Sequence, residues 1–168
     1  MVSVIVGALG FTLATVSLTW QIVAWRLSGG RARADLFIGA IQPTGVAYFT
    51  LPAKTSVAVV GRLGGEDFTR KALFITVRNT GRLPIMVERL LVRFLGKYRM
   101  AQLAFAVGPK MPHRLEIGES ETWGVELEKI TQLAQVLRVG KRLSSVKVRA
   151  EIELGNSKVI STRQKARL

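Results

Sequence analysis

The first 25 residues form the longest apolar stretch of the chain. Between Met1 and Trp25 the one strongly polar side chain is Gln21, and the first formal side-chain charge is Arg26. A helix of this length spans about 37 Å, which exceeds the hydrocarbon core of a bilayer, about 30 Å thick. Trp20 and Trp25 lie at its C-terminal end, where indole rings favour the headgroup level. The pattern predicts a transmembrane anchor helix over residues 1–26.

The charges around this segment predict its orientation. No Lys or Arg precedes the segment, whereas Arg26, Arg31 and Arg33 follow it closely. Because basic flanks stay in the cytoplasm, we expect a single-pass protein of the cell (inner or plasma) membrane. Its N-terminus would face outward and its C-terminal domain would be cytoplasmic.

Two other interpretations of the segment stay open at this point. Ala32-Arg33-Ala34 has the A-x-A form of a signal-peptide cleavage site, although a basic n-region is missing and the apolar run is long for such a peptide. A helix buried in the core of a soluble domain would also be apolar, but a small domain would have to surround it on all sides.

Small side chains recur along the segment with alternating spacings of four and three residues. In a lipid environment helices associate where small residues let their backbones approach, and a period of 3.5 residues implies a left-handed crossing. The pattern predicts self-association or docking onto another membrane helix, and the alternative is coincidence in a segment rich in small residues. The predicted helix–helix interface consists of Ser3, Gly7, Gly10, Ala14, Ser17, Gln21 and Ala24, with Ser28 continuing the pattern.

After this segment the period changes and strand signals follow. Residues 27–34 read as a flexible basic linker, and residues 35–168 as one β-sandwich domain. Residues 85–95 could form one long strand or two strands broken by a bulge, because the alternation loses phase at Arg89. We expect strands at 34–42, 46–51, 56–63, 71–79, 85–95, 98–107, 120–127, 146–154 and 158–162.

The clearest alternation in the chain is "VKVRAEIEL" at 146–154, which places Val146, Val148, Ala150, Ile152 and Leu154 on an inward face. One stretch, "EKITQLAQVLRVGKR" at 128–142, has the spacing of an amphipathic helix. Short strands punctuated by Gly and Pro, with one helix, are typical of an antiparallel sandwich. The predicted fold class is therefore mainly β, with an N-terminal transmembrane helix, a β-sandwich and one short α-helix.

Two stretches resemble a known kind of domain. "FITVRNTGRLPIMVERLLV" (74–92), followed by "RLEIGESETWGVEL" (114–127), is similar to the strand–NTG–strand and L-x-x-G-E-S pattern of immunoglobulin-like accessory modules in bacterial membrane and surface proteins. The resemblance covers about a quarter of the chain. It implies an Ig-like β-sandwich with a binding or spacer role, and it assigns no functional residues.

Charge indicates the kind of partner. The chain has 25 Lys and Arg against 11 Asp and Glu, a formal charge of +14, which favours contact with a polyanion. Near an anionic leaflet each basic side chain contributes about 1 kcal/mol of attraction. Nucleic acid is the less favoured partner, because the few aromatic residues fall mostly on strand positions. The predicted contacts with anionic lipid headgroups are Arg26, Arg31, Arg33, Arg163, Lys165 and Arg167.

The sequence argues against an enzyme. It contains no cysteine and a single histidine, His113, which excludes cysteine-based zinc sites, thiolate nucleophiles and two-histidine metal centres. His113 lies between Pro112 and Arg114, which is typical of a surface loop. Five acids fall between Glu116 and Glu128, at spacings that predict solvated side chains. We expect no catalytic residues, no metal and no cofactor.

The predicted function is that of a non-catalytic, membrane-anchored interaction or scaffold protein that self-associates or binds another membrane protein. A membrane-tethered nucleic-acid-binding domain and an exported surface or spacer domain are the alternatives. The usage of Arg, Ala, Val and Gly hints at a bacterial or bacteriophage source.

Overall fold

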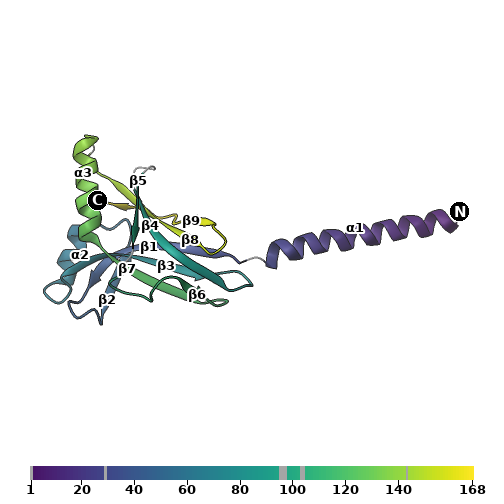
Figure 1. Cartoon of the computed structure of the whole chain (residues 1–168), viewed down its shortest axis with the longest axis horizontal. Coiled ribbons are helices and arrows are strands. Elements are labelled where there is room, and N and C mark those ends of the chain that lie inside the picture. Colours follow the sequence, from purple (N-terminus) through teal and green to yellow (C-terminus); the bar gives the residue numbers. More distant parts are fainter. Residues whose placement is uncertain (1, 29, 95–97, 103–104, 143) are drawn as a thin grey trace.

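The computed structural model describes the chain except residues 1, 29, 95–97, 103–104 and 143, and it leaves the side chains of 2–6, 8–9, 25–28 and 102 undescribed. One long helix projects from a β-rich body, and the two parts meet at residues 30 and 31 (Figure 1). All strand pairings in the described part are antiparallel.

The body contains two sheets. The first sheet has the strand order β2-β1-β3-β7, and the second has the order β10-β8-β4-β5, with β6 paired to β4 and β9 paired to β8. The first sheet consists of β1 (Ala32–Ile41), β2 (Tyr48–Pro52), β3 (Arg70–Asn79) and β7 (Ser120–Glu126). The second consists of β4 (Ile85–Phe94), β5 (Tyr98–Gln102), β6 (His113–Leu115), β8 (Lys147–Leu154), β9 (Val159–Ser161) and β10 (Ala166–Arg167).

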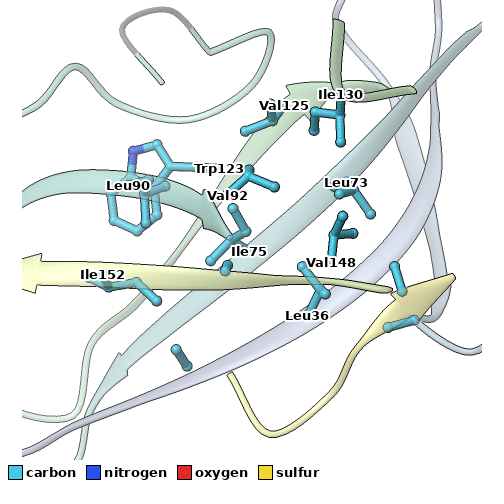
Figure 2. Close-up of a cluster of buried hydrophobic side chains, with 14 of the residues drawn as sticks. Leu36, Leu73, Ile75, Leu90, Val92, Trp123, Val125, Ile130, Val148 and Ile152 are labelled. Atoms are coloured by element: carbon cyan, nitrogen blue, oxygen red, sulfur yellow. The ribbon is translucent and has the colours of Figure 1, made fainter. Parts of the chain in front are cut away.

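The main hydrophobic core lies between the two sheets. Leu36, Leu73 and Trp123 of the first sheet and Leu90 and Val148 of the second are almost completely buried in one cluster, and Figure 2 shows their side chains converging. Nε1 of Trp123 donates a hydrogen bond to the carbonyl oxygen of Pro109 at 2.9 Å, which satisfies the indole inside the core. Both sheets therefore contribute to one main hydrophobic core.

One predicted strand is a helix. Residues 56–63 were expected to be extended because they are rich in valine, but α2 (Val57–Gly64) is helical. Oγ of Ser56 accepts a hydrogen bond from the backbone N–H of Val59 at 3.4 Å, and Val60 is buried. An N-cap serine and burial of one helical face outweigh the β propensity of valine in a segment this short.

The helix predicted over 128–142 is confirmed as α3 (Leu127–Gly140), which buries Leu127, Ile130 and Ala134. Of the two alternatives for residues 85–95, the structure shows one strand, β4, with a register shift between Val87 and Arg89 in its pairing with β8. Of the predicted strand 98–107, β5 contains Tyr98–Gln102, residues 103 and 104 lie outside the described residues, and 105–107 are not part of a strand.

The N-terminal helix corrects the sequence-based prediction of a membrane anchor. α1 (Val2–Ser28) is continuous, but within the described residues no helix is both long enough and apolar enough to cross a membrane. A crossing needs about 20 consecutive, predominantly apolar residues. Hydroxyl and amide side chains interrupt the described stretch 10–24 at five positions: Thr12, Thr15, Ser17, Thr19 and Gln21. The predicted transmembrane helix is therefore wrong, and with it the single-pass topology and the inner-membrane location.

The junction between α1 and the body is short. β1 already begins at Ala32, so three residues of the predicted linker 27–34 belong to the first sheet. The carbonyl oxygen of Arg31 accepts hydrogen bonds from the N–H groups of Thr80 at 2.8 Å and Gly81 at 3.1 Å. Gly30 packs so close to Ile85 that a Cβ there would lie 2.9 Å from its Cγ2 atom. The entry of the chain into the body is thus fixed by the turn that follows β3.

Asn79 joins the two stretches that carry the resemblance to immunoglobulin-like modules. Its buried amide donates to the carbonyl oxygens of Leu83 at 2.9 Å and Leu115 at 3.2 Å, and its Oδ1 accepts from Gly81 N–H at 3.0 Å. The backbone of Asn79 also bonds Gly118 and Glu119. The Asn-Thr-Gly turn and the Gly-Glu-Ser turn therefore stabilise each other. The immunoglobulin-like assignment itself stays a prediction.

Candidate interaction surfaces

The described part of α1 is an exposed apolar surface. Phe11 and Trp20 are 74% and 70% exposed. The hydroxyls of Thr15 and Thr19 donate to the carbonyl oxygens four residues earlier, both at 2.8 Å, so their polarity is satisfied within the helix. Other large apolar side chains exposed on α1 are Leu13, Val16, Leu18, Ile22 and Val23.

The predicted small-residue stripe follows this helix. A Cβ added at Gly7 or Gly10 would meet no atom within 4 Å, so both glycines face open space. Ala14, Ser17, Gln21 and Ala24 are exposed as well, whereas the side chain of Ser3 lies outside the described residues. The stripe is thus available to a partner along residues 7–24.

The predicted lipid-contacting residues are distributed over the body. Arg33 on β1 and Arg163 after β9 line one surface cavity of about 370 Å³, together with Ser161. The side chain of Gln164 holds this C-terminal segment against β1, because its Nε2 donates to Oδ1 of Asp35 at 2.8 Å. Arg31 and Lys165 are exposed but do not line this cavity. The side chain of Arg26 lies outside the described residues.

Three arginines lie side by side on the outer face of the second sheet. In the strand registers, Arg93 of β4 lies opposite Arg99 of β5 on one side and opposite Arg149 of β8 on the other. The neighbouring residues Val92, Phe94 and Val148 point into the core, so the arginines point away from it. We name Arg99, Arg93 and Arg149 the arginine row.

A buried carboxylate lies next to this row. Glu151 of β8 is only 1% exposed, and its Oε1 accepts a hydrogen bond from Nη1 of Arg93 at 2.6 Å. Nε of Arg99 lies 3.0 Å from the other oxygen, Oε2, yet Oε2 accepts no hydrogen bond from the described residues. The contact between Arg99 and Glu151 is therefore an ion pair without hydrogen-bond geometry, and it holds the guanidinium by charge.

The basic face extends beyond the arginine row. Arg167 of β10 lies opposite Lys147 of β8, and Lys147 shares its strand face with Arg149. Both Lys147 and Arg167 are exposed. Arg167, predicted from sequence as a lipid contact, thus belongs to the same face as the arginine row. On the other side, Arg89 is paired with Glu153 at 3.0 Å.

A second cavity of about 430 Å³ lies where α2 and α3 meet the start of β3. It is lined by Arg70, which is ion-paired with Glu126, and by Lys71, Glu128 and Thr131. The hydroxyl of Thr131 donates to backbone carbonyls of its own helix. Arg70, Glu126 and Thr131 of this cavity are thus already engaged.

Three of the five acids between 116 and 128, Glu116, Glu119 and Glu126, have structural partners. Oε1 of Glu116 accepts from Arg114, and Oε2 of Glu119 accepts the backbone N–H of Glu116, both at 2.7 Å. His113 lies on β6, a strand the sequence did not predict, with its ring 6.0 Å from that of Trp123 in an edge-to-face contact. No group of three potential metal-ligating side chains occurs among the described residues.

Sequence reasoning missed the arginine row. The alternation in 146–154 correctly placed Arg149 on the outer face of its strand, but Glu151, expected to be outside as well, is buried. The signal that could have located Arg93 and Arg99 is the strand pairing of β4 with β5 and β8, which one sequence does not reveal. Models of known protein families and the sequences of curated proteins give no match to this chain.

Proposed function

We propose that this chain is a non-catalytic interaction protein whose copies associate through α1 and thereby bring several basic β-sandwich domains together. The observation that carries the proposal is the exposed apolar surface of α1, a 27-residue helix that projects from the body (Figure 1). A helix that exposes this many large apolar side chains is normally covered by other protein.

The energy available from covering α1 is sufficient for association. Burying one large apolar side chain contributes about 1.5–3 kcal/mol, so the six exposed on residues 11–22 contribute on the order of 10 kcal/mol. This is comparable with the cost of association, estimated at about 4–15 kcal/mol. A bundle of several α1 helices covers more of each helix than a dimer does, and we expect an oligomer larger than two.

The small-residue stripe favours a second copy of this chain as the partner. The stripe repeats with a mean spacing of 3.5 residues, which keeps one face in register along a left-handed pair of helices. Its described members Gly7, Gly10 and Ala14 leave room for a close approach of backbones. Gln21 adds an amide that can pair with the same residue of a neighbouring copy.

Three of the five acids of 116–128 support a non-catalytic role. Glu116 and Glu126 are ion-paired with arginines, and Glu119 binds a backbone N–H group. Carboxylates that are already engaged in this way serve the fold rather than proton transfer to a substrate.

Analytical ultracentrifugation of the full chain tests the proposal. We expect an oligomer that becomes tighter as salt is raised, because each copy carries a formal charge of +14 and salt screens the repulsion between bodies. Gly7→Leu combined with Gly10→Leu should weaken the oligomer and reduce crosslinking between α1 helices. The matched control, Val16→Leu with Thr19→Leu, adds bulk on the opposite face of α1 and should leave the stripe contact intact. A monomeric full chain, or an oligomer unaffected by the glycine substitutions, would contradict the proposal.

A further inference from the structure

We propose that the outer face of the second sheet binds the phosphate backbone of double-stranded nucleic acid through the arginine row. The row is formed by Arg99, Arg93 and Arg149 on three adjacent strands. This site lies on the sandwich and does not depend on association through α1.

The arginine row has an excess of positive charge. Like charges directly opposite each other on neighbouring strands destabilise a sheet, yet here three arginines are adjacent. One carboxylate, Glu151, serves both Arg93 and Arg99. Within the part of the chain that the structure describes, no acidic side chain is ion-paired with Arg149. The row retains two positive charges in excess, and an external anion offsets that cost.

Glu151 positions the guanidinium groups of Arg93 and Arg99. Buried in the sheet face, its carboxylate holds Arg93 by a hydrogen bond and attracts Arg99 without accepting a hydrogen bond from it. The side chain of Arg99 is 53% exposed, so its donors are accessible to a ligand. Glu151 is thus a positioning residue, and the arginines are the groups that contact phosphate.

The width of the arginine row matches the spacing of phosphates along a duplex strand. Adjacent strands are about 4.8 Å apart, so a row over three strands extends about 10 Å between its outer members. Along one strand of a duplex a phosphate occurs about every 3.4 Å of axial rise, which gives about three phosphates over the same distance. Lys147 and Arg167 continue the basic face beyond Arg149 and can reach the next phosphates.

The chemistry of the face favours a duplex backbone over other polyanions. Guanidinium groups bind phosphate oxygens in a bidentate fork. Single strands are normally bound with aromatic residues on which bases stack, but Tyr98, the aromatic residue beside Arg99, lies on the opposite strand face, opposite Phe94 of the core. Binding through backbone phosphates alone should be independent of base sequence.

The test measures binding of the full chain to two unrelated duplexes of about 20 base pairs, from about 50 to about 200 mM salt. We expect equal affinity for both duplexes and a steep loss of affinity with salt. Each phosphate contact contributes about −0.9 to the slope of log K against log salt. Arg99→Gln combined with Arg149→Gln should therefore flatten the slope by about 1.8 and weaken binding roughly 60-fold at 0.1 M salt.

A matched double variant separates the effect of the arginine row from the effect of net charge. Arg62 on α2 and Arg78 on β3 are exposed and belong to elements of the other sheet or packed on it. Arg62→Gln with Arg78→Gln removes the same charge and should leave the slope nearly unchanged. Glu151→Gln should weaken binding while the salt slope stays near that of the wild type, because the same phosphates are contacted by less well positioned arginines. Unfolding curves of each variant show that the compared proteins are folded.

Two further probes test whether the arginine row prefers nucleic acid to other polyanions. Vesicles of anionic phospholipid and poly-glutamate are offered at the same concentration of negative charge. Weaker binding to both than to duplex supports the proposal. Equal or tighter binding to either probe would overturn it in favour of a lipid surface or an acidic protein. Equal effects of the row variant and the control variant would also overturn it, since the charge would then act without a defined site.

Discussion

The outer faces of the two sheets carry opposite chemistry. On the first sheet, Phe74 is completely buried in a small second cluster, stacks on Tyr48 at a ring distance of 4.8 Å and is covered by the segment around Val107. On the second sheet, the corresponding face carries the arginine row, and Arg99 is half exposed. One outer face is thus closed by the chain itself, and the other is left charged.

The apolar outer face depends on two glycines. Phe74 lies between β1 and β7, where a Cβ on Gly39 would lie 3.0 Å from the ring and a Cβ on Gly124 would lie 3.1 Å from it. A Cβ on Gly39 would also lie 1.9 Å from the carbonyl oxygen of Phe49, which no side chain can accommodate. An aromatic ring that packs over glycines on the neighbouring strands covers their backbone, and this stabilises the sheet. The contrast shows that the outer face of the first sheet contributes to stability, whereas the outer face of the second places like charges side by side, as a binding surface would.

The largest expected effect on stability comes from removing the buried ring of Phe74. Phe74→Ala should cost about 3–5 kcal/mol of unfolding free energy, because a completely buried ring leaves a cavity between β1, β3 and β7. Phe74→Leu, which keeps much of the volume, should cost clearly less. Urea unfolding measures both. A loss below about 1 kcal/mol for Phe74→Ala would mean that this face does not stabilise the body.

An intermediate effect is expected at the carboxylate of the charged face. Glu151→Gln should cost about 1–2 kcal/mol, less than the full value for a buried ion pair because Arg93 and Arg99 are partly exposed. The loss should be greater at low salt, where repulsion between the arginines is least screened. Thermal unfolding at two salt concentrations measures this, and a loss that does not vary with salt would contradict the charge-based explanation.

The smallest effect has the opposite sign. Arg149→Gln should raise the unfolding free energy by about 0.5 kcal/mol at low salt, because it removes a like charge opposite Arg93. At high salt the gain should disappear. The same variant should bind a duplex less tightly, which is the expected trade between stability and function. A destabilised Arg149→Gln protein would show that Arg149 serves the fold, and the contrast between the two faces would then fail.

Much of the β structure was predictable from local pattern. The alternation at 146–154 identified β8 and its buried face, and the loss of phase at Arg89 coincides with the register shift in β4. The helical spacing after residue 127 identified α3. These predictions hold because one buried face imposes a period of two or 3.6 residues on the sequence itself.

The predictions failed where local signals compete, and at the N-terminal segment. Valines at 57–60 favoured a strand, but the Ser56 cap and the burial of Val60 produced α2. The apolar run at the N-terminus suggested a membrane anchor, but the described helices do not meet the requirements for a crossing. The short strands β6 and β10 carry too few residues for any periodicity to be read.

The sequence by itself determined the basic charge of the chain, the apolar character of its first helix and the inward faces of its longer strands. These properties depend on residue type and on spacing along one segment. The tertiary structure alone decided that Arg93, Arg99 and Arg149 form a row around Glu151, and that Phe74 is closed in between Gly39 and Gly124. Both arrangements depend on strand register, which is fixed by the packing of distant segments around a shared core.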